Sequence, residues 1–91
     1  MAVTTESAAF FHKNLARSAL RALSAQLRAT TQFMTRDERF ALYEELDERV
    51  IREAVRLSQE HKQTNRNKVE FDLFFPTAAA NVVDAYTKTG N

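Results

Sequence analysis

The chain has 91 residues, of which 44% are hydrophobic and 27% are charged, and its net charge at pH 7 is +1. This balance indicates one small globular domain over residues 1–91 and excludes a chain that is mainly disordered. One Gly and one Pro exclude a turn-rich sandwich or barrel, and the absence of Cys excludes disulfides and thiolate metal sites. No apolar run approaches the ~20 residues that a membrane-spanning helix needs.

The first element that we expect is a helix over about residues 7–29. Its apolar residues fall on one broad arc when they are placed at ~100° per residue. The opposite side of this helix carries four cations and one aromatic residue, and we call it the basic face: Phe10, Lys13, Arg17, Arg21 and Arg28. The basic face could contact an acidic protein surface, follow a phosphate backbone, or only face solvent.

A second helix is expected over about residues 36–62. Thr35 is well placed as its N-cap, because Glu38 stands three residues later and completes a reciprocal capping box. The apolar stripe of this helix advances by three or four residues: Phe40, Tyr43, Leu46, Val50, Ile51, Ala54 and Leu57. Since the link between the two helices is short, we predict a long antiparallel helical hairpin.

Charge alternates in blocks along the chain. Residues 7–36 carry only bases, residues 37–48 carry six acids against one base, and residues 49–68 carry six bases against two acids. Such blocks suit helices that pack against one another or against copies of themselves. Within the second helix, two acid-before-base pairs at i,i+4 are expected to add small stabilisation: Glu45–Arg49 and Glu48–Arg52.

After the second helix, we predict a short extended or β segment over about residues 69–75. It begins with alternating apolar and acidic residues, which is the period of a half-exposed strand. Pro76 ends this segment, and residues 77–86 could form a small C-terminal helix with Val82 and Val83 on its apolar side. We expect the two ends of the chain, residues 1–6 and 87–91, to fray.

A single strand leaves its backbone groups without a ladder partner. We therefore expect the segment to pair with another copy, join a partner's sheet, or lie across the helices, and the first two options require association. Three aromatic residues would anchor that interface: Phe71, Phe74 and Phe75. Two further bases precede the segment and could support the basic face in binding nucleic acid: Arg66 and Lys68.

The sequence offers little for catalysis, since it has no Cys, no Gly-rich phosphate loop and no Ser or Thr beside a credible base. His12 and His61 make a poor metal ligand set, and we expect no catalytic residue, metal or cofactor. We predict a non-catalytic protein–protein interaction module, acting as a homo-oligomer or in a larger complex. The alternatives are a nucleic-acid-binding regulator that uses the basic face, and a small-ligand or cyclic-nucleotide site between protomers.

The expected location is the cytoplasm, because a chain without Cys fits a reducing compartment. A mitochondrial location is the alternative, since the first helix has the Ala-, Ser- and Arg-rich composition of a targeting segment.

Overall fold

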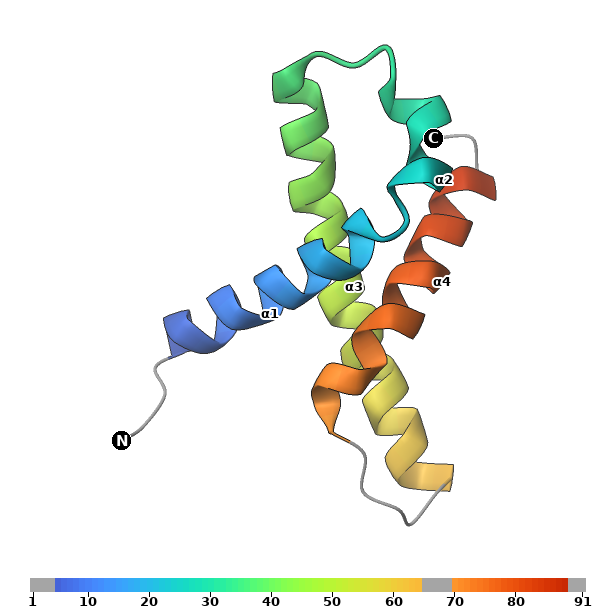
Figure 1. The fold of residues 1–91 in the computed structure, drawn as a ribbon. Helices are drawn as coiled ribbons and strands as arrows, with labels where there is room; N and C mark the ends of the chain where they lie inside the picture. Colours follow the sequence, from blue (N-terminus) through green and yellow to red (C-terminus); the bar gives the residue numbers. More distant parts are fainter. Residues whose placement is uncertain (1–4, 65–69, 89–91) are drawn as a thin grey trace.

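The computed structural model describes residues 5–64 and 70–88, with side chains over 11–63 and 70–88, and its regular elements are all helical (Figure 1). In chain order they are α1 (Thr5–Arg21), α2 (Ser24–Thr31), α3 (Arg36–Thr64), the 3₁₀ turn η1 (Phe71–Phe74) and α4 (Phe75–Lys88). The mainly α class predicted from the sequence is therefore confirmed. None of the described helices is long and apolar enough to cross a lipid bilayer.

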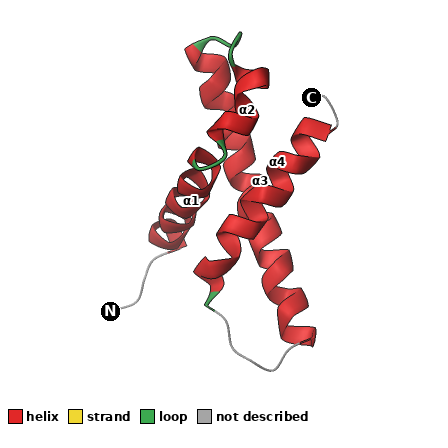
Figure 2. Cartoon of the chain, turned by 45° about the vertical axis from the view of Figure 1, so that its right-hand side comes forward, coloured by secondary structure: helices red, strands yellow, loops and turns green. Residues whose placement is uncertain are grey.

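The core lies where α4 packs against α3, with α1 and α2 closing its edges (Figure 2). Helices α3 and α4 run in opposite directions. The ring of Phe74, just before α4, meets His61 late in α3, and the side chain of Asn81 in α4 bonds Glu53, which stands about two turns earlier in α3. Twelve apolar side chains are buried in this core: Ala16, Leu20, Leu27, Leu42, Leu46, Val50, Ala54, Phe75, Ala78, Ala79, Val82 and Val83. The antiparallel partner of α3 is thus α4, whereas α1 crosses α3.

The single first helix predicted over residues 7–29 is two helices, because the chain turns at Ala22 and Leu23. The amide of Leu23 donates to the carbonyl of Leu20 at 2.9 Å, a tightened last turn that ends α1. Helical period continues through the break, so the local sequence gives no stop signal. The bend lets Leu20 and Leu27 enter one core from two directions, which a straight rod ~34 Å long could not do.

The α3 helix begins as predicted. The amide of Glu38 donates to the Thr35 hydroxyl at 3.2 Å, and the amide of Thr35 donates to the Glu38 carboxylate at 3.0 Å. These two bonds are the reciprocal capping box, and they fix the direction in which the chain enters α3. The predicted stripe is correct at Leu46, Val50 and Ala54, which are fully buried.

The predicted strand over residues 69–75 is wrong in its described part, which is helical from Phe71 onward. The apolar residues from Phe71 to Tyr86 recur at three- and four-residue steps, so the short alternation at the start of the segment was misleading. Pro76 does not stop the element. It stands in the first turn of α4, where a backbone N–H has no intrahelical partner to lose.

The small C-terminal helix predicted over residues 77–86 is confirmed and is longer, since α4 begins at Phe75 and ends at Lys88. Helix α4 covers the apolar stripe of α3, and no strand among the described residues needs a ladder partner. Both premises for obligatory self-association are therefore removed. Association with further copies stays a prediction.

Replacing Phe75 tests whether this residue belongs to the core. Phe75 is 2% exposed, so we expect Phe75→Ala to lower the free energy of unfolding by about 3–5 kcal/mol. Phe33→Ala is the matched control, because Phe33 is 89% exposed and its loss should change stability by less than ~0.5 kcal/mol. Urea unfolding followed by circular dichroism measures both. Equal stabilities for the two variants would contradict this core.

Candidate functional site

The structure divides the predicted basic face between internal contacts and solvent. The ammonium of Lys13 donates to Glu44 at 3.0 Å, and Arg17 bonds Asp47, so two cations are neutralised by α3. Arg21 and Arg28 are exposed and form no hydrogen bond or ion pair with other described residues. The side chain of Phe10, and all of Arg66 and Lys68, lie outside the part of the chain that the structure describes.

Arg17 holds the buried carboxylate of Asp47 along one edge of its guanidinium, through Nε and Nη2. Its Nε lies 3.2 and 3.1 Å from the two carboxylate oxygens, and Nη2 lies 2.7 Å from Oδ2. Asp47 is 2% exposed, and the hydrogen bond to it raises the pKa of Arg17 above its ordinary value. The Arg17 guanidinium also lies 5.3 Å from the ring centre of Tyr43, a cation–π contact. The interaction therefore joins α1 to α3 through a desolvated ion pair.

Lys13 and Glu44 form a second, more exposed pair beside it. Their mutual hydrogen bond lowers the pKa of Glu44 and raises the pKa of Lys13. The acidic residues of α3 thus pair with basic residues of α1 in the same molecule. The alternating charge blocks had two explanations, helices that pack against one another or against other copies, and this pairing is the first of them. A phosphate backbone that bound the basic face would have to compete with these carboxylates for Lys13 and Arg17, two of the four cations of that face.

The predicted aromatic segment packs inward. Phe75 is in the core, and its ring stands edge-on to Phe71 at 5.4 Å between centroids. His12 lies 5.1 Å from the ring of Phe71, and His61 lies 5.7 Å from the ring of Phe74. Phe71 and Phe74 are half-buried against the core, so these aromatics hold η1 onto α1 and α3. Their role as partner anchors stays a prediction.

The exposed aromatic surface lies at a corner that the sequence prediction missed. Phe33 is 89% exposed in the turn between α2 and α3, and Phe40 is 62% exposed early in α3. The neighbouring Met34 packs against the core, and its amide donates to the Thr31 carbonyl at 3.1 Å. We call Phe33 and Phe40 the corner surface. The predicted buried stripe is wrong at Phe40, which is exposed, whereas Leu42 is buried.

These features define a class of protein before any comparison is made. Exposed aromatic side chains at one corner, over a core closed by helices, are typical of a small helical binding protein. A comparison with known protein families then identifies the family. A family model described as "Phage RNA polymerase binding, RpbA" matches residues 1–73, which is most of the chain.

The chain belongs to this phage RNA polymerase-binding family. It is therefore a non-catalytic protein with a protein–protein interaction role, and the partner of its family is RNA polymerase. No curated protein and no solved structure matches the chain. The predictions of a non-catalytic role and of a protein partner are confirmed at this level.

The buried ion pair generates a prediction about stability. Arg17→Met would leave the Asp47 carboxylate buried without its partner, so we expect a loss of about 3–5 kcal/mol in the free energy of unfolding. Adding Asp47→Leu should recover most of that loss, because an apolar pair replaces both charges. Arg21→Met is the matched control, since Arg21 is exposed one turn later. Urea denaturation of the wild type, Arg17→Met, Asp47→Leu and the double variant gives the coupling energy, and additive effects would show that the pair is not coupled.

Stability should also depend on pH through hydrogen-bonded carboxylates. Backbone bonding at Thr35 lowers the pKa of Glu38, bonding to Lys13 lowers the pKa of Glu44, and bonding to Arg56 lowers the pKa of Glu53. Because the unfolded chain protonates these groups first, they stabilise the fold above their ordinary pKa, and the contribution disappears as the pH falls from about 5 through the lowered values.

The Glu44 part of this effect can be isolated. We expect Glu44→Gln to reduce the drop in melting temperature between about pH 7 and pH 4. Glu45→Gln is the control, since Glu45 is exposed and forms no hydrogen bond or ion pair with other described residues. Differential scanning calorimetry at several pH values measures both variants. An unchanged pH dependence in Glu44→Gln would contradict the assigned role.

Proposed function

We propose that this protein regulates transcription by binding RNA polymerase through the corner surface, with Phe33 and Phe40 as its anchors. The observation that carries the proposal is the family match over residues 1–73. A surface shared by the family must be built from that part of the chain, which includes α1, α2, α3 and most of η1. Among the residues whose side chains are described, the five large apolar ones that are exposed all fall inside it: Phe11, Phe33, Phe40, Val55 and Leu73.

The corner surface has the character of an anchoring site. Aromatic residues contribute large contact areas at a small entropic cost and are common in the energetically dominant centre of protein interfaces. Phe33 and Phe40 are the two most exposed aromatics of the described chain, at 89% and 62%. In solution this exposure serves no packing purpose, so a partner that covers both rings gains apolar burial at ~25 cal/mol per Å².

The corner is also held in place before binding. The capping box between Thr35 and Glu38 fixes the start of α3, and Met34 packs into the core on the other side of the turn. Phe33 is thus presented between two restrained residues. Pre-organisation of this kind reduces the ordering cost that a partner must offset. The adjacent Arg36, Asp37 and Arg39 are exposed and supply a polar rim around the rings.

Binding measured against the purified multisubunit RNA polymerase of the infected bacterium tests the proposal. We expect Phe33→Ala and Phe40→Ala each to weaken binding by about 10- to 30-fold, which corresponds to ~1.4–2 kcal/mol. Leu73→Ala is the control, because Leu73 is 67% exposed on η1, at the other end of α3, and should leave affinity within ~2-fold. Biolayer interferometry with immobilised polymerase gives the affinities.

Two outcomes would contradict the proposal in different ways. If the wild-type protein binds neither this polymerase nor a single-subunit phage polymerase, the function is wrong. If it binds and both Phe variants bind as tightly as Leu73→Ala, the corner surface is wrong while polymerase binding stands. Thermal melts of each variant exclude unfolding as the cause of any loss.

A further inference from the structure

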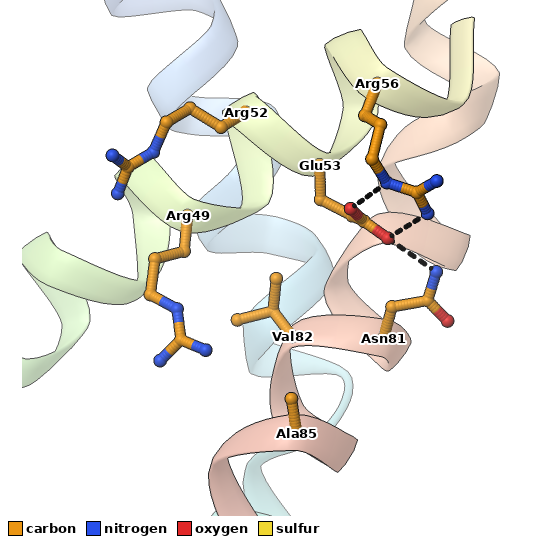
Figure 3. A pocket seen from close by; sticks show the side chains of 7 residues that line it. All are labelled: Arg49, Arg52, Glu53, Arg56, Asn81, Val82 and Ala85. Atoms are coloured by element: carbon orange, nitrogen blue, oxygen red, sulfur yellow. Dashed lines mark hydrogen bonds and ion pairs between the residues drawn. The ribbon is translucent and has the colours of Figure 1, made fainter. Parts of the chain in front are cut away.

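A hollow of about 420 Å³ lies between α3 and α4, away from the corner surface (Figure 3). Four residues of α3 and three of α4 line it: Arg49, Arg52, Glu53, Arg56, Asn81, Val82 and Ala85. Val82 and Ala85 present apolar surface from α4, and the long polar side chains of α3 stand around it. We call this hollow the arginine pocket.

One side of the arginine pocket is neutralised by its own contacts. Arg56 grips Glu53 with two bonds, at 2.7 Å from Nε and 2.8 Å from Nη2, and it reaches Glu60 at 2.8 Å. The Asn81 amide donates to the same Glu53 carboxylate at 2.9 Å. Hydrogen bonding to Arg56 lowers the pKa of Glu53, which therefore stays charged and engaged. The Glu53 carboxylate is thus committed to these neighbours.

The other side carries two cations that have no partner among the described residues. Glu45 and Glu48 stand one turn before Arg49 and Arg52, and these i,i+4 pairs were expected to form. Neither pair forms, and no hydrogen bond or ion pair joins Arg49 or Arg52 to any other described residue. Figure 3 shows both guanidinium groups on the side of the pocket away from the Glu53 contacts, separate from each other and pointing in different directions. Arg49 is half-buried, so one of the two charges is already partly desolvated.

The side chains of the pocket favour a ligand that carries an anionic group next to an apolar group. A guanidinium binds a carboxylate through two parallel N–H donors, and this geometry is stronger where water is partly excluded. The apolar wall of Val82 and Ala85 adds a surface for a hydrophobic side chain. A volume of about 420 Å³ holds a few side chains and is too small for a duplex groove or an extended strand.

A long polyanion fits this surface poorly. Two exposed acids, Glu45 and Glu48, precede Arg49 and Arg52 by one turn of α3, and the net charge of the chain is only +1. Nucleic-acid binding draws on many phosphate contacts at once, and these two acids would repel a strand that continued along α3. A short acidic segment that places one or two carboxylates on Arg49 and Arg52 avoids that repulsion.

We propose that the arginine pocket binds a short acidic peptide segment of the polymerase, with a carboxylate on Arg49 and Arg52 and an apolar side chain against Val82 and Ala85. The choice of polymerase as the source of this peptide rests on the proposed function, whereas the choice of an acidic peptide as the ligand does not. The pocket needs α4, and α4 lies beyond the residues 1–73 that match the family. The family match therefore covers the α3 side of the pocket and not its α4 side.

Nuclear magnetic resonance of the full chain tests the pocket without polymerase. The probe is a blocked peptide of alternating aspartate and leucine, and the control peptide has lysine in place of aspartate. We expect the aspartate peptide to shift the Nε–Hε signals of Arg49 and Arg52 and the methyl signals of Val82, and the lysine peptide to shift none of them. Absence of these shifts, or equal shifts at the exposed Arg21, would overturn the proposal.

The class of ligand is decided in the same titration. Inorganic phosphate and single-stranded oligothymidine are added in parallel at matched ionic strength. We expect both to shift the signals of Arg49 and Arg52 less than the aspartate peptide does, because phosphate offers no apolar group to Val82 and the successive phosphates of oligothymidine would meet the nearby acids of α3. A larger response to oligothymidine would overturn the peptide proposal in favour of nucleic acid.

Polymerase binding then tests the source of the segment. We expect Arg49→Gln with Arg52→Gln to weaken affinity for polymerase by about 10-fold or more, with a reduced dependence on salt. Lys62→Gln with Lys88→Gln removes the same two charges outside the pocket and should leave affinity within ~2-fold. If the peptide shifts appear but both double variants bind polymerase equally, the segment does not come from polymerase and that part of the proposal falls. If the wild type fails to bind polymerase, the proposed function fails while the peptide result still stands or falls by itself.

Discussion

The apolar stripe of α3 must be covered, and the rest of the structure depends on how α4 covers it. Leu46, Val50 and Ala54 are fully buried, and Phe75 and Val83 are the largest side chains that α4 packs into the same core. The molecule measures 44 × 32 × 17 Å, so one apolar layer serves the whole chain. A thin core of this kind leaves little stability to spare, and the ion pair that fastens α1 therefore matters.

The fastening of α1 explains why a row of cations is a poor guide to function here. Arg17 is committed to a carboxylate that is 2% exposed, and Lys13 to Glu44 beside it. A buried pair adds little net stability over an apolar pair of the same size, but it tolerates only one alignment of the two helices. The cations available to a partner are those that such pairing leaves over, and two of these, Arg49 and Arg52, lie on a different helix from the one the sequence favoured.

The sequence predicted correctly those features that depend on residues close to one another in the chain. The capping box at Thr35, the length of α3 and the non-catalytic character all follow from neighbouring residues or from composition. The turn at Leu23 and the exposure of Phe40 do not, because each depends on where a distant helix packs. The strand error at residues 69–75 was avoidable, since the helical period that starts at Phe71 continues across Pro76 to Tyr86. A proline early in a helix was taken for a stop when it marked a start.

The residues that pack the core and the residues that we propose for recognition lie in different parts of this chain. Phe75 and Phe33 are the same residue type in one small protein, yet one is 2% exposed and the other 89%. The Phe33 ring stands exposed on a restrained turn and is available to a partner, and we propose that this partner is the RNA polymerase bound by the family. The proposed arginine pocket offers charge in place of apolar area, since no described residue pairs with Arg49 or Arg52. Because the pocket needs α4, the helix that completes the core also completes the second surface, and loss of α4 would remove both together.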